Sequence, residues 1–417
     1  MHVLAFYQYF STNEVSGSTR PYEIGRRMLE RGDSVTFIAA NWIYATGRKE
    51  PQRGLFWTRS KVDALDVIRV NIPFGGSRNM VPRIIGFLWF IPFSFFAAFS
   101  VRSPDVIVAS STPLTIGIPA YLLSRIRRVP FVFELRDLWP DCPVEWGFVK
   151  SRFLIRAAYW LESFLYRKAA FIFTVTEGIR KEIIKKGIPA ERIRTITTAN
   201  DLTLFTSDGP EADLLTVANI PADAFVCIHV GSLGFSNALD FLLDGAERLL
   251  DEPSIHFLIM GHGAEKARLK SEVSRRNLHN VHLLNPVPKA ALPPFLRRAD
   301  LGLALVKPTR YTYIFLQNKF FDYLACGCPV ILNFEGEARE YIEPANAGVY
   351  VPPDDVDALA AAIRSLAADR ATARTMGACA RQVAERHFSW DYKAADYRET
   401  LSSVITESSP VTHGSKV

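Results

Sequence analysis

The sequence predicts an α/β protein of two similar domains, each built on a parallel sheet, with a cleft between them. In both halves, short apolar segments alternate with helical segments of ten or more residues, and such helices connect parallel strands by right-handed crossovers. The 417 residues, 48% of them apolar, are enough for two cores of ordinary size. A polar stretch at 206–213, which includes Gly209 and Pro210, is the expected linker. Clefts between domains are favoured ligand sites.

The first domain is expected to span residues 1–205. Its strands are apolar segments that suit burial on both faces, at 2–7, 34–39, 106–109, 131–134, 170–175 and 194–197. Its helices are expected at 20–31, 114–125, 151–167 and 177–186.

The second domain, residues 214–385, repeats this logic. Strands are expected at 225–230, 256–260, 281–284, 299–306 and 330–332, and helices at 238–250, 264–276, 289–299, 318–326 and 356–368. A C-terminal helix at 386–405 is expected to pack back on the first domain. The remainder, 407–417, lacks periodicity and is expected to be a disordered tail.

Composition indicates a cytoplasmic protein with anionic partners. The net charge of +6 and pI near 9.0 suit nucleotides or an acidic membrane surface. Basic residues do not run together with aromatics, so nucleic acid is not expected as a partner. The five cysteines are scattered without a CxxC pair, which is typical of reduced thiols rather than of disulfides or a zinc site. The chain opens directly on a strand, so no signal peptide is expected.

Residues 84–101 form an uncharged segment with seven aromatic side chains. Its eighteen residues reach only the lower limit for crossing a bilayer, and Pro92 lies within it. A strand follows at once, which favours a helix that packs in the domain or lies in a membrane interface. Because Arg78, Arg83 and Arg102 flank the segment, we expect peripheral association with the inner leaflet. The alternative is that these aromatics fill the first core.

The segment 318–332 combines a short helix, a turn and a buried strand. Lys319 and Asp322 are three residues apart, so they are neighbours on the helix surface, and Gly327 ends the helix. An irregular loop at 307–317 enters this helix from the preceding strand. Such loops bind phosphorylated ligands in α/β folds. The alternative is an ordinary helix and strand whose charged pair is only solvated.

Glycines occupy the turns after three predicted strands. Gly17 lies in a small-residue turn before the first helix, Gly231 follows the first strand of the second domain, and Gly261 and Gly263 follow the next. Such turns let backbone N–H groups approach an anion, although Ser18 or Thr19 could simply cap the first helix. The pattern is not GxGxxG, so a dinucleotide is not expected.

Four ionisable residues lie at and after the end of the strand at 131–134: Glu134, Arg136, Asp137 and Asp141. Charges at the carboxyl end of a strand either serve a site or form local ion pairs, and the position favours a site. No HExxH motif, no Cys/His cluster and no GxSxG elbow accompanies them, so we expect neither a metal nor a nucleophilic serine.

Together these residues resemble the retaining glycosyltransferases of family 4, which have the GT-B fold of two Rossmann-like domains. The nearest group is the bacterial surface-polysaccharide transferases related to L-fucosamine transferase. The resemblance covers nearly the whole chain to about residue 400, and its Arg-Asp-Leu-Trp-Pro motif at 136–140 is specific. The other matching segments are 17–24, 31–35, 143–145, 261–263, 299–300, 318–327, 336–339 and 348–353.

The resemblance implies retaining, metal-independent transfer of a hexosyl or N-acetylaminosugar group from a nucleotide diphosphate sugar, such as a UDP-sugar, without a cofactor. The second domain would hold the nucleotide, with Asp322 on the ribose hydroxyls. The family's partner carboxylate would fall at Ile314, and residues 232–238 carry none of its usual basic residues. Lys319, Arg310 or Lys307 would contact the phosphates instead.

The first domain would hold a saccharide or lipid-linked acceptor for a surface polysaccharide such as O-antigen or exopolysaccharide. Asp137 would act on the acceptor hydroxyl or on the oxocarbenium-like state, with Arg136 and Glu134 beside it. Gly17, Gly231, Gly261 and Gly263 would lie at the donor. The alternatives are a sugar-nucleotide epimerase and a non-catalytic subunit that binds nucleotide sugars.

Overall fold

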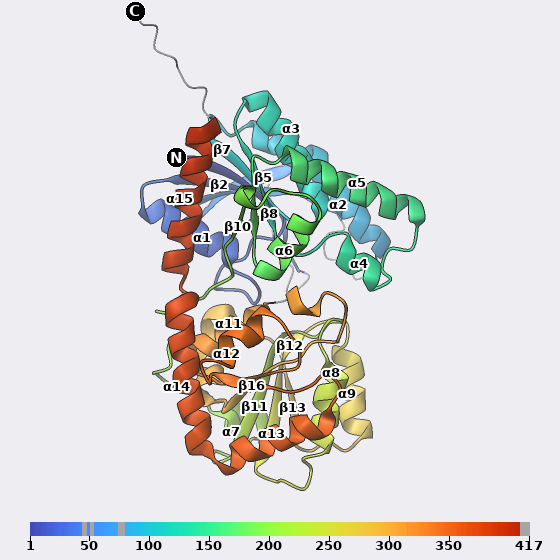
Figure 1. Cartoon of the computed structure of the whole chain (residues 1–417), viewed down its shortest axis with the longest axis vertical. Coiled ribbons are helices and arrows are strands. Elements are labelled where there is room, and N and C mark those ends of the chain that lie inside the picture. The colour runs from blue at the N-terminus through green and yellow to red at the C-terminus, as the bar shows by residue number, and fades with distance from the viewer. Residues whose placement is uncertain (44–47, 51–53, 74–79, 315, 409–417) are drawn as a thin grey trace, which may run out of the picture. The chain divides into compact units, whose positions relative to one another are not determined.

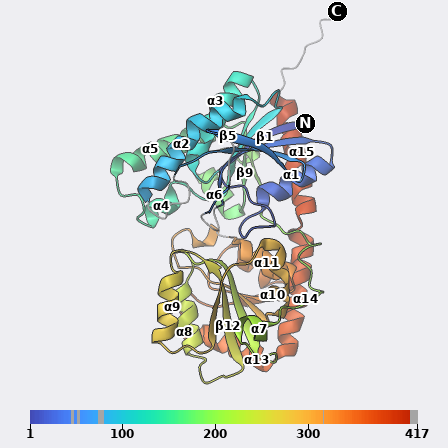
Figure 2. The same ribbon diagram turned by 180° about the vertical axis from the view of Figure 1, so that it is seen from behind.

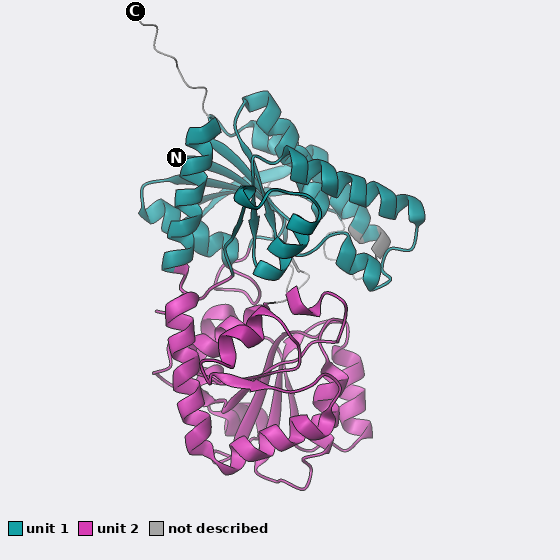
Figure 3. Ribbon diagram, in the orientation of Figure 1, with its two compact units in different colours: residues 1–10, 20–197, 391–417 teal, residues 11–19, 198–390 magenta. Residues whose placement is uncertain are grey.

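The computed structural model describes residues 1–43, 48–50, 54–73, 80–314 and 316–408. The chain forms two compact units (Figure 3). Unit 1 comprises Met1–Phe10, Arg20–Thr197 and Asp391–Val417, and unit 2 comprises Ser11–Thr19 and Thr198–Trp390. Each unit is a Rossmann-like α/β layout on a parallel sheet, so the predicted fold class is confirmed.

Unit 1 is built on an eight-stranded sheet with the order β10-β9-β8-β7-β1-β2-β6-β5. Every adjacent pair is parallel except β5 and β6, which form an antiparallel hairpin at the edge. The central strands are almost wholly buried, as their continuous apolar runs require. The strands are β1 (His2–Tyr7), β2 (Ser34–Ala40), β5 (Trp57–Val62), β6 (Leu65–Val70), β7 (Val106–Ser110), β8 (Phe131–Leu135), β9 (Phe171–Thr174) and β10 (Ile193–Thr195).

The helices of unit 1 are α1 (Arg20–Glu30), α2 (Met80–Phe99), α3 (Gly117–Arg127), α4 (Asp141–Glu145), α5 (Arg152–Lys168), α6 (Glu177–Lys185) and α15 (Trp390–Ser408), labelled in Figure 1. Short 3-10 turns η1 (Leu114–Ile116) and η2 (Ala190–Arg192), and a two-stranded ribbon of β3 (Trp42–Ile43) and β4 (Arg48–Lys49), complete the unit. Ser151 and Thr176 cap α5 and α6 by accepting hydrogen bonds from backbone N–H groups.

Unit 2 is built on a six-stranded, wholly parallel sheet with the order β13-β12-β11-β14-β15-β16. Its strands are β11 (Phe225–Ser232), β12 (Ile255–His262), β13 (Val281–Leu284), β14 (Leu301–Ala304), β15 (Val330–Leu332) and β16 (Gly348–Tyr350). Its helices are α7 (Leu214–Ala218), α8 (Leu239–Glu247), α9 (Lys266–Arg275), α10 (Pro293–Arg298), α11 (Asn318–Ala325), α12 (Glu337–Ile342), α13 (Val356–Ala368) and α14 (Arg370–His387), with 3-10 turns η3 (Lys289–Ala291) and η4 (Thr312–Ile314).

The boundaries of the units differ from the expected 1–205 and 214–385. The loop 11–19 belongs to unit 2, where the carbonyls of Asn13 and Val15 accept hydrogen bonds from the backbone of Ala290 and Lys289. The stretch 206–213, expected as a linker, lies inside unit 2. Arg297 donates to the carbonyl of Pro210 at 2.9 Å and to that of Thr206 at 3.3 Å. The polar stretch 206–213 is therefore a loop fixed by hydrogen bonds within unit 2.

The last described helix, α15, belongs to unit 1 from Asp391 onward. Its Asp391 pairs with Arg27 at 2.6 Å, its Arg398 with Asp33 at 2.5 Å, and its Tyr397 ring stacks on Phe173. The helix continues to Ser408, past the residue at which the tail was expected to begin. The rest of the expected tail, 409–417, lies outside the described residues.

Helix α2 contains residues 84–99 of the apolar segment 84–101 and divides them between core and surface. Phe87, Phe90, Ala97 and Ala98 are buried, whereas other large side chains of the helix are exposed, including Leu88, Trp89, Phe96 and Phe99. Of the flanking arginines, Arg102 is exposed, Arg78 lies outside the described residues, and the side chain of Arg83 is not described. Within the described part of the chain, no helix has the length and apolarity needed to cross a membrane.

Candidate active site

The carboxyl end of β8 carries Glu134 as the centre of a buried network. The Arg20 guanidinium meets Glu134 Oε1 at 2.8 Å, and both side chains are completely buried. The hydroxyls of Ser110 and Tyr7 donate to Glu134 Oε2, and Arg20 also donates to the carbonyl of Thr197 at 2.9 Å. The network therefore joins β1, β7, β8 and the start of α1.

Burial alone would raise the pKa of the Glu134 carboxyl, but Arg20 and the two hydroxyls outweigh it, and the pKa lies below its usual value. Burial and the neighbouring carboxylate raise the pKa of Tyr7. Glu134 was expected to act beside Asp137, but the structure gives it a structural position. The sequence could not show this, because its partner Arg20 is 114 residues away.

Asp137, in contrast, is exposed three residues beyond Glu134. The Thr112 hydroxyl donates to Asp137 Oδ2 at 2.8 Å, and Ser111 Oγ accepts from the Arg136 N–H at 3.3 Å. Two loops at the carboxyl edge of the sheet thus fix the carboxylate and leave it accessible. Asp141, the fourth ionisable residue, instead accepts from Tyr159 at 2.9 Å and pairs with Lys186, which places it in an ion-pair network with α5 and α6.

In unit 2, helix α11 places Lys319 beneath the end of β11. Its side chain is 6% exposed, and its ammonium group donates to Asn237 Oδ1 at 2.8 Å and to His229 Nε2 at 3.2 Å. Asn237 is itself held because its amide donates to the carbonyl of Ser232. Among the described residues, no carboxylate forms an ion pair with Lys319, so its buried charge has no counter-ion within this part of the chain.

Burial lowers the pKa of Lys319 to about 7. Burial, and then the charge of Lys319, lower the pKa of His229 far below its usual value, so the imidazole is neutral and accepts a hydrogen bond. An anion bound next to Lys319 would hold the lysine protonated. His229 and Asn237 were not predicted as site residues, although His229 lies near the carboxyl end of β11 and Asn237 lies in the loop that follows the strand.

The glycines at this edge have different physical roles. Gly231 has a φ of +113°, and among the described residues a Cβ there would have one atom within 4 Å, Lys319 Cε at 3.9 Å, so the space above Lys319 is open. A Cβ on Gly261 would lie 2.1 Å from the Gly231 carbonyl oxygen, and one on Gly263 would lie 2.2 Å from that of Leu233. Gly261 and Gly263 are therefore required for the close packing of the ends of β11 and β12 and of the residues that follow them.

Asp322, one turn further along α11, is buried and already bonded. Its Oδ1 accepts from Asn200 Nδ2 at 2.8 Å and pairs with Lys289, whose ammonium also lies over the Phe205 ring. Asp322 is 4% exposed. It therefore anchors 198–205 and η3 to α11, a role that local spacing could not reveal because Asn200 is 122 residues away.

The remaining predicted phosphate ligands lie on loops of unit 2. Arg310 is exposed, with its guanidinium 5.5 Å from the Tyr311 ring, and the Lys307 ammonium lies 4.4 Å from the Phe235 ring. Gly17 has a φ of +123° in the exposed part of loop 11–19. Ile314, the position at which the resemblance would place a carboxylate, is 1% exposed. Within the described residues, no cluster of His, Cys, Asp and Glu has the makeup of a metal site.

Comparison with known proteins gives a consistent result for both halves of the chain. Residues 17–199 match the family described as "Glycosyl transferase 4-like domain", and residues 224–369 match "Glycosyl transferases group 1". A curated relative is "Putative colanic acid biosynthesis glycosyl transferase WcaI" of Escherichia coli, 26% identical over 281 residues, which are 65% of this chain and 69% of that protein.

Solved structures share the fold over almost the entire chain. Sucrose-phosphate synthase from Thermosynechococcus elongatus has a TM-score of 0.76 at 20% identity and covers 98% of this chain and 100% of its own. Anabaena HepE in complex with UDP-glucose has a TM-score of 0.69 at 19% identity and covers 97% of this chain and 100% of its own. At these identities the likeness concerns the fold.

Proposed function

Because the chain belongs to the family 4/group 1 glycosyltransferases, GT-B enzymes that use nucleotide-sugar donors, we propose that it transfers a hexosyl or N-acetylaminosugar group from a UDP-sugar with retention. The acceptor is a saccharide or a lipid-linked saccharide in the synthesis of a cell-surface polysaccharide. The E. coli relative is named for colanic acid biosynthesis, which supports this class of product. The enzyme would then work at the inner membrane face as a peripheral protein.

One observation carries the donor half of this proposal. Lys319 is a buried cation with no carboxylate partner among the described residues, and the space above it at Gly231 is open. An unpaired buried charge is costly, and an anion of the ligand can compensate it. A leaving nucleoside diphosphate gains negative charge, and a preorganised ammonium group stabilises that charge in the transition state.

Asp137 carries the acceptor half. It is an exposed carboxylate at the carboxyl edge of a parallel sheet, where α/β folds bind ligands, and Thr112 fixes its orientation. A carboxylate in that position can accept the proton of an acceptor hydroxyl as it attacks, or stabilise an oxocarbenium-like centre. Arg136, whose backbone N–H is held by Ser111, lies next to it.

The direct test is turnover by the purified full chain with labelled UDP-sugars and a polyprenyl-diphosphate-linked saccharide. We expect labelled lipid-linked product and free UDP, and NMR of the new linkage should show the anomeric configuration of the donor. Conversion of the UDP-sugar to its epimer without acceptor would identify an epimerase. Tight UDP-sugar binding without turnover of any donor would identify a non-catalytic subunit.

Substitution of Lys319 by methionine should lower affinity for a nucleotide sugar by about 10- to 100-fold, because a charge-assisted contact to the diphosphate is lost. Calorimetry with a UDP-sugar measures this. The side chains are similar in length and Lys319 is buried, so the fold should persist. Lys270→Met changes an exposed lysine of α9 and should leave affinity unchanged.

The same titrations should depend on pH in the wild type. The pKa of Lys319 is about 7 in the free protein. A bound anion favours the protonated lysine, so affinity is highest below pH 7 and falls as the pH rises from 6 to 8. The diphosphate of a UDP-sugar keeps its charge over this range. A wild-type pH profile identical to that of Lys319→Met would contradict the assignment.

Asp322→Asn should weaken binding of UDP by about 1.5–3 kcal/mol if Asp322 Oδ2 accepts hydrogen bonds from the ribose. It should also lower thermal stability, because Lys289 loses its ion-pair partner. Asn200→Ala removes a contact of the same carboxylate and should affect stability alone. Unchanged calorimetric affinity for UDP in Asp322→Asn would leave Asp322 with its structural role only.

A further inference from the structure

Helices α2, α3 and α5 of unit 1 lie next to one another, α2 against α3 and α3 against α5 (Figures 1 and 2). Right-handed crossovers between successive parallel strands place all three on one face of the sheet. Their outer surfaces expose large apolar side chains, which are 40% to 79% accessible. These are Ile84, Ile85, Leu88, Trp89, Phe96 and Phe99 of α2, Leu122 and Ile126 of α3, and Phe153, Leu154 and Trp160 of α5. We call this surface the α2–α3–α5 face.

Among the described side chains, the exposed charges on these three helices have one sign. Their only acidic residue is Glu162, which is buried and paired with Lys186. The exposed charged side chains among the described ones are all basic: Arg125, Arg152, Arg156, Arg167 and Lys168. Helix α9 of unit 2, in contrast, carries Glu272, which pairs with Arg275 of the same helix and with Arg276 just after it. An apolar surface with basic residues and no exposed acid is complementary to anionic lipid headgroups over hydrocarbon.

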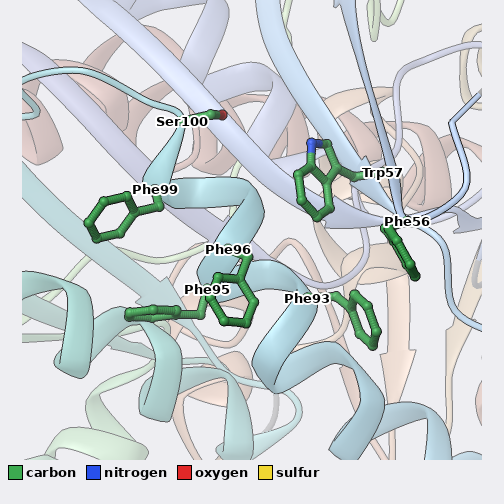
Figure 4. A pocket seen from close by; sticks show the side chains of 7 residues that line it. All are labelled: Phe56, Trp57, Phe93, Phe95, Phe96, Phe99 and Ser100. Atoms are coloured by element: carbon green, nitrogen blue, oxygen red, sulfur yellow. The ribbon is translucent and has the colours of Figure 1, made fainter.

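An open groove of about 560 Å³ adjoins this face, between α2 and the edge hairpin (Figure 4). It is lined by Phe56, Trp57, Phe93, Phe95, Phe96, Phe99 and Ser100. The Phe56 and Phe93 rings stack at 5.2 Å, so the hairpin and the helix form its walls. The Arg127 guanidinium lies 4.7 Å from the Phe99 ring and donates to the Phe99 carbonyl, which sets a cation beside the last phenylalanine of the groove.

We propose that the α2–α3–α5 face docks on an anionic lipid bilayer and that the groove takes a hydrocarbon chain of a bilayer lipid. The occupant follows from charge: a second copy of the chain would set arginines against arginines, which like charges disfavour, whereas anionic headgroups neutralise them. The inference depends on the proposed function only for its biological consequence, because a transferase docked on the bilayer would meet lipid-linked acceptors. Binding itself needs neither donor nor acceptor.

Flotation of the full chain with vesicles tests the docking. We expect binding to vesicles of equal parts phosphatidylglycerol and phosphatidylcholine at low salt, and little binding to phosphatidylcholine alone. The double variant Phe96→Ser, Phe99→Ser should bind at least about tenfold more weakly, since two exposed rings no longer enter hydrocarbon. Arg125→Gln with Arg156→Gln should weaken anionic binding about 30-fold, or about fivefold for each arginine. Leu215→Ser, an equally exposed apolar residue of unit 2, should bind as the wild type does.

Phosphatidylglycerol brominated on its acyl chains tests the groove. Bromine should quench tryptophan fluorescence, and Trp57→Phe should remove a large part of that quenching. Quenching that is unchanged in Trp57→Phe would overturn the groove assignment.

Absence of vesicle binding, or binding unaffected by the Phe96/Phe99 variant, would overturn the docking. If light scattering shows that the wild type is a dimer and that this variant is a monomer, the face is a protein contact instead. Transfer to a soluble saccharide acceptor should persist in the variant, which separates this failure from failure of the proposed function.

Discussion

Asp137→Asn is expected to lower turnover of the nucleotide sugar by about 100- to 10,000-fold, the usual contribution of a positioned general base. The amide keeps the size of the side chain and its contact with Thr112, but it can no longer take a proton. Affinity for the donor should barely change, because the nucleotide contacts proposed above lie on unit 2. Steady-state turnover and calorimetry on the same preparation measure the two quantities.

The matched control is Asp105→Asn. Asp105 is also exposed and belongs to unit 1, but it precedes β7 at the amino end of the sheet, where it accepts from the His2 N–H. This variant should turn over at a rate close to wild type. If Asp137→Asn also turns over near the wild-type rate, Asp137 takes no part in the chemistry, and the acceptor-side carboxylate must be sought elsewhere.

Glu134→Gln is expected to lower the free energy of unfolding of unit 1 by about 3–5 kcal/mol, because it leaves the Arg20 guanidinium buried without its counter-ion. Urea unfolding at neutral pH measures this. Glu30→Gln should have little effect, since its carboxylate is largely exposed and pairs with Arg26 of the same helix. A loss below about 1 kcal/mol in Glu134→Gln would contradict the structural role given to the pair.

The effect of Glu134→Gln should also depend on pH. The folded-state pKa of Glu134 lies below the usual value. Its stabilising contribution is therefore complete above the unfolded-state pKa, which is about 4.3, and is lost as the pH falls through the folded value. The difference between wild type and variant should shrink in acid, and a difference independent of pH would argue against an ionised Glu134.

The fold was predictable where a local sequence pattern extends over enough residues to be recognised. Buried parallel strands such as β7 and β8 are continuous apolar runs, and the helices between them are long enough to be recognised. Strand β5 was missed because its sequence, WTRSKV, is an edge strand with no apolar run and with partial exposure along its length. Its turn uses Asp63 and Ala64 at positive φ, in place of the Asn-Gly that usually marks such a hairpin.

The sequence predicted which positions would carry candidate site residues, but not the role of each residue. Glu134 and Asp137 stand in one charged run, and only the distant Arg20 and Thr112 determine which is buried and which is accessible. Lys319 and Asp322 were expected to act as neighbours on one helix. Each instead has partners from other segments, Asn237 and His229 for the lysine, and Asn200 and Lys289 for the carboxylate. Such non-local partners leave no trace in residue spacing.

The interleaved chain also sets the order in which the protein can be completed during synthesis. Arg27 and Asp33 leave the ribosome before their partners Asp391 and Arg398, which follow 364 and 365 residues later. At translation rates of about 5–20 residues per second, this delay is roughly 20–70 s. All of unit 2 has emerged by Trp390, before α15 can close unit 1. The strands of the unit 1 sheet are all made by Thr195, but the surface that α15 covers stays open until that helix has been synthesised.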